Sequence, residues 1–206
     1  MIRTIRLALL AILLPTAAMS HATPLYTAAG FGTADKLVTF DEVSIAPGSA
    51  VTTQFSAYGV TLSADMRRDS LFFNPANFSG AYIENTGADM PHSIFFNGPV
   101  TAAGAYWEFN SGITQRLSAY LNGNLVESYT YTNGGCCESS AFLGFANSGF
   151  DEIRLNAVDG DTSFIMDNVS FRPAQISAVP EPVSLALFGI GALGIAVMRK
   201  RKHQLR

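Results

Sequence analysis

The sequence is poor in the residues that carry most enzyme chemistry. It has three histidines, two cysteines and one tryptophan in 206 residues. His21 and His203 lie in the terminal segments described below, which leaves His92, in a turn-like stretch where we expect a surface position. No H-E-x-x-H motif and no repeated histidine pattern is present. A zinc site and a histidine-assisted nucleophile are therefore disfavoured, and we predict that the protein is not an enzyme.

Positive charge is also scarce between the two ends of the chain. Seven of the thirteen basic residues lie within 1–22 or 199–206, whereas all sixteen acidic residues lie between these ends. The central part therefore carries a net charge of about −10. We do not expect such an acidic segment to bind nucleic acid or an anionic membrane surface, and it suits cations or neutral polymers better.

The first 22 residues have the pattern of a secretory signal peptide. Arg3 and Arg6 precede an apolar run over 7–14, and Ser20 and Ala22 are the small residues that precede a cleavage site. An apolar run this short does not span a membrane as a permanent anchor. We therefore predict export, with cleavage after Ala22.

The centre of the chain lacks long helical patterns and has short strand patterns in their place. Asn122-Gly123 lies between two apolar runs and is the two-residue signal for a type I′ hairpin. The pattern predicts a lead-in over 23–36 and an all-β antiparallel sandwich or jelly roll over 37–173. A solvated loop is expected at 65–69 and one helical turn within 51–58. The expected strands are 37–43, 60–64, 71–73, 81–84, 93–96, 100–109, 113–121, 125–131, 142–146, 150–157 and 163–171.

The C-terminal segment has three features in a fixed order. A linker over 174–182 ends in Pro180, Glu181 and Pro182, and an uncharged apolar run follows over 183–198. Sixteen helical residues rise about 24 Å, slightly less than the hydrocarbon core of a bilayer, so we expect a marginal transmembrane helix. Basic residues stay in the cytoplasm, which places the preceding domain on the other side of the membrane. The basic cytoplasmic tail, 199–206, opens with Arg199, Lys200, Arg201 and Lys202.

This order of features, after an export signal, resembles the PEP-CTERM sorting tail, which is also called the ice-binding protein C-terminal domain. In that family the triplet is the recognition site of exosortase, a membrane protease of Gram-negative bacteria that make extracellular polysaccharide. The resemblance implies that Pro180, Glu181 and Pro182 form the processing site. It also implies transient anchoring in the inner membrane with the domain in the periplasm, and later transfer to the cell surface or matrix. A simple tail-anchored protein is the alternative.

A second, looser resemblance concerns the first and last expected strands. Thr39-Phe40-Asp41 and the run 164–171, which contains Asp167, are similar to the terminal strands of the carbohydrate-binding type of jelly roll. In that type a calcium ion often joins these strands. The resemblance implies that Asp41 and Asp167 are calcium ligands, with Asp159 or Asp161 as an alternative.

Cys136 and Cys137 are adjacent and form the only cysteine pair in the sequence. In an oxidising compartment we do not expect two thiols to stay free. A bond between neighbouring cysteines requires a strained ring. A vicinal disulfide, which we prefer, a bond to another chain and a pair of reduced thiols all stay open.

Aromatic and acidic side chains are the remaining candidates for function. Tyr129 and Tyr131 share one face of an expected strand and offer a possible surface for stacking on sugars. We therefore predict a binding or structural module associated with exopolysaccharide. The alternative is a polysaccharide-active enzyme of the glycosidase type, which needs two facing carboxylates. The candidates for that pair are Glu84, Glu108, Glu127 and Glu138.

Overall fold

The computed structural model describes residues 22–27, 36–70, 77–85, 91–134, 140–158 and 163–175. The chain divides into two compact units, Met1–Pro173 and Ala174–Arg206, and every described strand belongs to the first. A short 3-10 helix, η1 (Ser56–Tyr58), accompanies the strands. The strands are β1 (Thr23–Thr27), β2 (Lys36–Val38), β3 (Val60–Leu62), β4 (Met66–Ser70), β5 (Ala81–Asn85), β6 (His92–Phe109), β7 (Thr114–Leu121), β8 (Asn124–Thr132), β9 (Ala141–Ala157) and β10 (Phe164–Pro173).

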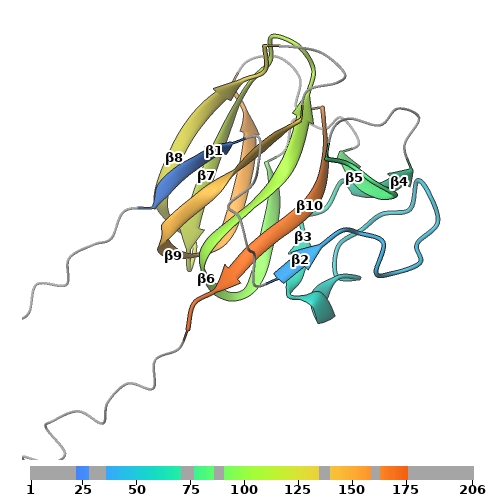
Figure 1. Ribbon diagram of the computed structural model, residues 1–206, viewed down its shortest axis with the longest axis horizontal. Coiled ribbons are helices and arrows are strands. Elements are labelled where there is room, and N and C mark those ends of the chain that lie inside the picture. Colours follow the sequence, from blue (N-terminus) through green and yellow to red (C-terminus); the bar gives the residue numbers. More distant parts are fainter. Residues whose placement is uncertain are drawn as a thin grey trace, which may run out of the picture. The chain divides into compact units, whose positions relative to one another are not determined.

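All strand pairs are antiparallel, and the two long strands β6 and β9 take part in both halves of the domain (Figure 1). In one half the strand order is β3, β6, β9, β7 and β8. In the other half it is β4, β5, β10, β6, β9 and β1, with β2 also paired to β10. The β6 to β9 pairing is irregular between Phe95 and Val100, and Asn147 on β9 has a φ of 65°. Such irregularities bend a strand, which allows β6 and β9 to pass from one half to the other.

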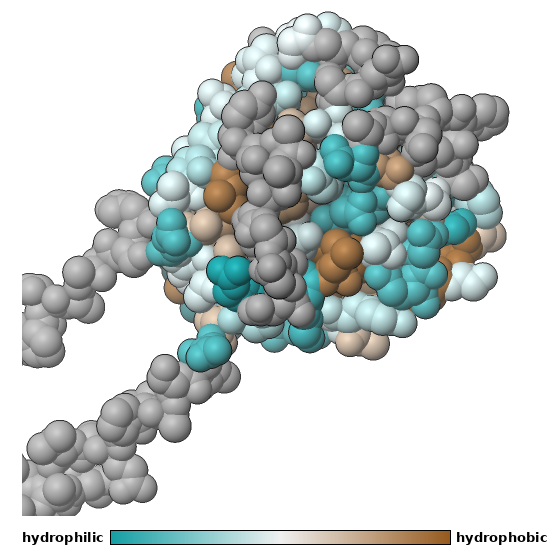
Figure 2. Space-filling model, in the orientation of Figure 1, coloured by the Kyte–Doolittle hydropathy of each residue, from teal (hydrophilic) through white to brown (hydrophobic). Residues whose placement is uncertain are grey.

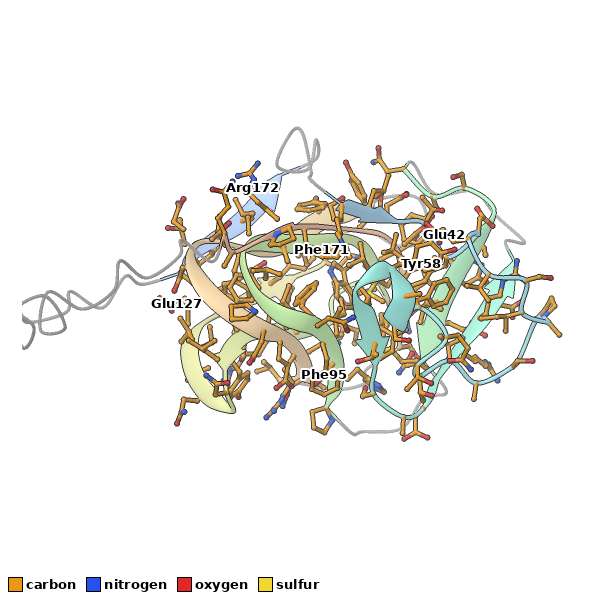
Figure 3. All side chains as sticks on the ribbon, turned by 90° about the horizontal axis from the view of Figure 1, so that it is seen from below. Glu42, Tyr58, Phe95, Glu127, Phe171 and Arg172 are labelled. Atoms are coloured by element: carbon orange, nitrogen blue, oxygen red, sulfur yellow. The ribbon has the colours of Figure 1, made fainter. Side chains whose placement is uncertain are left out.

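The two halves face each other across one apolar core. Phe96 and Phe171, which come from different halves, have ring centroids 5.2 Å apart, and Phe109 lies 5.9 Å from Tyr131. Trp107 is almost fully buried in the same core. Figure 3 shows side chains filling the space between the two halves. Burial of this apolar surface is the main favourable contribution to folding.

The described surface carries few large apolar side chains. Those that are exposed come from separate parts of the chain, and Figure 2 shows brown residues lying singly or in small groups among pale and teal ones. Scattered apolar residues of this kind are normal on a protein surface. The exposed large apolar residues are Leu37, Tyr58, Phe95, Leu125 and Val158.

The predicted all-β antiparallel class is confirmed. The hairpin is also confirmed, because β7 and β8 flank Asn122 and Gly123, whose φ values are both positive, 50° and 77°. A type I′ turn requires positive φ at both central residues, which Asn and Gly tolerate best. The expected helical turn is η1, Ser56–Tyr58.

Several predicted boundaries differ from the structure. Each of β6 and β9 is one strand where two were expected, because a bulge bends the strand without ending it. The expected loop 65–69 largely forms the edge strand β4, in which Arg67 is paired across the strands with Glu84. The expected lead-in 23–36 begins with β1, which pairs with β9. The expected strand 71–73 lies outside the described residues.

The predictions for the two terminal segments fall almost entirely outside the described residues. The predicted signal peptide 1–22 lies, apart from Ala22, outside the described residues, as does the predicted transmembrane helix 183–198. Within the described part of the chain, no helix has the length and apolar character needed to cross a membrane.

Candidate functional site

A row of acidic side chains lies on the outer face of the sheet formed by β5, β10 and β6. Ile165 on the central strand β10 is the register partner of Glu84 on β5 and of Glu108 on β6. Register partners in an antiparallel sheet point to the same face. The next residue, Met166, points the opposite way and is buried in the core. Glu84 and Glu108 therefore flank Ile165 on the face away from the core.

A cavity of about 260 Å³ lies beside this row. Its walls come from the ends of β5 and β6, from the start of β10 and from the residues next to them. Carboxylates, amides and a hydroxyl are present together with two aromatic rings. The lining residues are Glu84, Asn85, Glu108, Phe109, Asn110, Ser163, Phe164 and Ile165.

The two carboxyl groups of the cavity have different surroundings. Glu84 accepts a hydrogen bond and ion pair from Arg67, with Nε and Oε1 2.7 Å apart. Glu108 is 6% exposed and lies at the end of β6, next to Phe109. Two carboxyl groups that share a site can take different chemical roles when their environments differ in this way.

The structure also brings Asp41 and Asp167 to one short segment of backbone. Asp41 Oδ1 accepts a hydrogen bond from the amide of Ala81 at 3.0 Å. Asp167 Oδ2 accepts one from the amide of Ser79 at 3.0 Å, and Oδ1 accepts one from Asn168 at 2.6 Å. The two acids predicted to share a calcium ion therefore hold amides that are two residues apart.

Asp167 is fully buried and has acidic neighbours. The pKa of Asp167 is raised to about 7, mainly by burial and also by the charges of Asp41 and Glu42, against the lowering effect of the two backbone hydrogen bonds. Each neighbouring carboxylate disfavours a charge on Asp167. A bound cation or a proton would relieve this repulsion.

The backbone around these acids adopts special conformations. Gly80 has a φ of 72°, and a side chain there would collide with the Asp41 carboxylate. Asn168 has a φ of 55°, and its side-chain amide donates a hydrogen bond to the Asn77 carbonyl at 2.7 Å. Only glycine and, less well, asparagine or aspartate adopt such values without strain. The sequence therefore permits a tight turn that lays an amide-rich segment over both acids.

A metal ion at this place would need further ligands. Among the described residues, no group of three or more His, Cys, Asp or Glu side chains is arranged to hold a metal. Calcium takes six to eight oxygen ligands and accepts backbone carbonyls and water beside carboxylates. The two carboxylates are oxygen donors of the kind that suit it. The alternative ligands Asp159 and Asp161 lie outside the described residues.

Tyr129 and Tyr131 have structural contacts that give the predicted stacking surface no support. The Tyr129 hydroxyl donates a hydrogen bond to the Leu25 carbonyl and accepts one from the Gly144 amide, each at 3.1 Å. Burial raises its pKa well above the ordinary value. The rings of Tyr129 and Tyr131 pack against the core, the first beside Phe145 and the second beside Phe109.

The expected surface position of His92 is wrong. The residue is 1% exposed, and its ring meets that of Phe164 edge-on with centroids 5.2 Å apart. It is the first residue of β6, where strand alternation directs it inward.

The structure also contains a partly buried ion pair that the sequence did not reveal. Glu152 on β9 accepts two hydrogen bonds from Arg154, at 2.8 and 3.1 Å, and one from the Ser93 hydroxyl at 2.6 Å. The Arg154 guanidinium lies 4.1 Å from the centre of the Tyr120 ring. Alternation along β9 places Glu152 and Arg154 on one face, but register with β6 and β7 was needed to find their partners.

The remaining candidates are not joined to the cavity within the described structure. Glu127 lies on the edge strand β8 and bonds to the amide of Ser128, and Figure 3 shows it at the opposite end of the domain from Glu42 and Tyr58. Outside the described residues lie Glu138, Cys136, Cys137, Pro180, Glu181, Pro182, Arg199, Lys200, Arg201 and Lys202.

Comparison with solved structures gives a remote similarity. Three chains match, and one of them is the crystal structure of the enzymatically active domain of tailspike protein 4 from bacteriophage CBA120. The identity is 16% and the TM-score 0.36, over 59% of this chain and 20% of the tailspike chain. A similarity at this level supports no argument about function.

Comparison with known sequences is informative at the C-terminus. No curated protein matches this chain. A family described as the PEP-CTERM protein-sorting motif matches residues 178–202, which include the Pro-Glu-Pro triplet, the apolar run and the first four basic residues. The chain is therefore a protein with a C-terminal PEP-CTERM sorting motif.

Proposed function

We propose that this protein is an exported matrix or cell-surface component whose β-domain is a binding or structural module associated with exopolysaccharide. The sorting motif at 178–202 carries this proposal, because it indicates export, membrane-anchored sorting and processing by exosortase. The finer steps are part of the proposal: a cleaved signal peptide, transient anchoring in the inner membrane of a Gram-negative cell with the domain in the periplasm, and cleavage at Pro180, Glu181 and Pro182.

Three properties of the domain support a polymer ligand. The cavity beside Glu84 and Glu108 combines carboxylate, amide and hydroxyl groups with the apolar side chain of Ile165, and polar groups set into an apolar wall are typical of ligand sites. The exposed large apolar side chains of the described surface are scattered, which does not favour a large apolar protein interface. The net charge of about −10 between the terminal segments disfavours nucleic acid as a partner.

A calcium ion at Asp41 and Asp167 is part of the same proposal. Asp167 is fully buried beside other acids, and both carboxylates lie against the backbone of residues 79–81. A divalent cation would balance these charges and fix this segment against β10. Its role would be structural. A vicinal disulfide between Cys136 and Cys137 stays a separate prediction.

Replacement of the triplet tests the sorting part of the proposal. The wild-type chain and a P180A/E181A/P182A variant would be expressed in a host that contains exosortase and fractionated. We expect the wild type as a shortened form outside the inner membrane and the variant as a longer form within it. Equal size and location of both chains would contradict processing at the triplet and would favour a simple tail anchor. Co-sedimentation with isolated matrix polysaccharide tests the binding part.

A polysaccharide-active enzyme is the second candidate, and one observation favours it. Glu84 and Glu108 line the same cavity and stand two strands apart, a backbone separation of about 10 Å. Glycosidases place their two carboxyl groups roughly 5 to 10 Å apart. Release of reducing ends from the matrix polysaccharide, lost in both Glu84→Gln and Glu108→Gln, would establish the enzyme. Binding of the polysaccharide without release of reducing ends would favour the binding module.

A further inference from the structure

The cavity between Glu84 and Glu108 has the size of a site for part of a polymer. At about 260 Å³ it is smaller than the 300–1,000 Å³ of pockets that enclose drug-sized ligands. One sugar ring fits such a volume, whereas several consecutive residues of a polysaccharide do not. The rest of a chain would have to continue outside the cavity, over the surface of the sheet.

The charge around the cavity is negative. Glu84 and Glu108 contribute two carboxyl groups, and Asp167 lies two residues beyond Ile165 on the same face of β10. Among the described residues that line the cavity there is no basic side chain. Arg67 reaches Glu84 from β4 at 2.7 Å and balances that one charge, which leaves more carboxyl groups than basic side chains around the cavity. A ligand that carries carboxylate, sulfate or phosphate groups would meet like charge, which costs binding energy.

The chemistry of the walls suits hydroxyl groups and the apolar side of a ring. Carboxylate oxygens accept hydrogen bonds from hydroxyl or ammonium donors, and these bonds are stronger than those between neutral groups. The exposed Asn110 carries an amide that both donates and accepts, whereas the Asn85 amide is engaged with the Phe164 backbone amide and the His92 ring. Ile165, which is half-buried between the two carboxyl groups, supplies apolar wall for the C–H groups of a sugar ring, whereas the rings of Phe109 and Phe164 pack in the core.

We propose that this cavity binds one residue of a polysaccharide without acidic groups, with Glu84 and Glu108 receiving hydrogen bonds from opposite sides of the ring. The inference rests on the proposed function and adds the location of the site and the charge class of the ligand. A neutral sugar and an amino sugar share the required donors. Uronic, sulfated and phosphorylated sugars are excluded by the charge of the site.

An array of immobilised oligosaccharides tests the charge class with the exported chain. The array carries neutral, glucosamine-containing and uronic-acid-containing oligosaccharides of several linkages. We expect binding to neutral or glucosamine-containing probes only, and the stronger of these two signals identifies the preferred donor. Binding to uronic-acid probes at equal strength would overturn the proposal.

Two conservative variants test the location. For the best probe, Glu84→Gln and Glu108→Gln should each weaken binding about tenfold or more, because each removes a charge-assisted hydrogen bond. Glu127→Gln, a carboxyl on β8 outside the cavity, is the matched control and should bind like the wild type. Unchanged melting temperatures verify that the variants are folded. Unchanged affinity in both cavity variants would overturn the inference.

The outcomes separate this inference from the proposed function. If the wild-type chain sediments with matrix polysaccharide and both cavity variants do so equally well, the location of the sugar site in this cavity is wrong. The proposed function as a binding module then still stands. If the wild type binds neither the polysaccharide nor any probe on the array, the proposed function itself fails.

Discussion

Glu152 and Asp167 are both buried carboxyl groups, but they are compensated in different ways. Glu152 is 5% exposed and is bonded to Arg154 and Ser93, so its charge has a cation within hydrogen-bond distance. Asp167 is 0% exposed and has amide donors, while Asp41 and Glu42 contribute negative charge around it. The first site is complete within the chain. The second has hydrogen-bond donors and forms no ion pair with a described residue, which is the setting in which a bound ion has most to contribute.

This difference separates a structural ion pair from a candidate site. Burial alone does not mark function, because buried charges that are paired are common in protein cores and interfaces. What marks Asp167 is that burial and acidic neighbours raise its pKa together. Changing the compensation of one carboxyl group at a time therefore measures the two sites against each other.

Removal of the cation from the complete site should have the largest effect. Arg154→Met keeps an unbranched side chain but removes the guanidinium from the Tyr120 ring and leaves Glu152 buried without its counter-ion. We expect a loss of about 3 kcal/mol in the free energy of unfolding, at the low end of the range for broken buried pairs because the Arg154 side chain is 32% exposed. Urea denaturation measures it. Arg116→Met, on the exposed face of β7, is the control and should change stability by less than about 0.5 kcal/mol. Equal stability of both variants would contradict the assigned role of the pair.

Addition of a cation to the incomplete site should have the next largest effect. At pH 7.5, calcium at a hundredfold excess over its dissociation constant should stabilise the protein by about 2.7 kcal/mol. Thermal melts in calcium and in chelator measure this shift. Asp41→Asn and Asp167→Asn should abolish it, whereas Arg154→Met should retain it. A wild-type melt that is the same in calcium and in chelator would contradict the calcium site.

The pH dependence of stability should also differ between the two sites. Without bound calcium, the pKa of Asp167 is about 7 in the folded protein. Its ordinary value of 3.8 applies to the unfolded chain. Below pH 3.8 the group is protonated in both states, and no charge is buried. Between these values the unfolded chain binds fewer protons than the folded one, so stability falls as pH rises from about 4 to about 7 and then levels off.

The measurement is the difference between wild type and Asp167→Asn in urea denaturation across that pH range. Other carboxyl groups titrate in both proteins, and their effects largely cancel in the difference. Glu127→Gln serves as the control and should follow the wild-type curve. A difference curve that is flat, or that rises with pH, would mean that Asp167 is compensated by a partner within the folded chain.

Local sequence patterns predicted the parts of the fold that depend on neighbouring residues. The Asn122-Gly123 hairpin followed from the φ values that a two-residue turn requires, and the antiparallel β class followed from short strand patterns. The continuous strands β6 and β9 could not be predicted, because Asn, Gly and Pro within a strand look like turn residues when no partner strand is known. β4 was missed for a similar reason, since Arg67 and Arg68 suit an edge strand as well as a loop.

The candidate sites show the same division. The sequence named Asp41, Asp167, Glu84 and Glu108, but their grouping depends on β10 lying between β5 and β6, and strand order is not local information. Strand alternation placed Tyr129 and Tyr131 on one face of β8, but it could not show which of the two faces packs against the core. In the structure these two residues are on the core-facing side. The sorting motif was predicted in full, because its features are contiguous in the chain.

Tyr129 provides an uncharged case for the same comparison and should give the smallest effect. Its hydroxyl joins the Leu25 carbonyl of β1 to the Gly144 amide of β9, so both of its hydrogen-bonding functions have partners, as at Glu152. Tyr129→Phe keeps the ring against Phe145 and should cost about 1 kcal/mol, measured by urea denaturation. Because no charge is involved, the loss should be independent of calcium and constant between pH 4 and 7. A calcium-dependent or pH-dependent loss would show that the Asp41 and Asp167 site is coupled to the opposite edge of the sheet, and the two regions could no longer be treated separately.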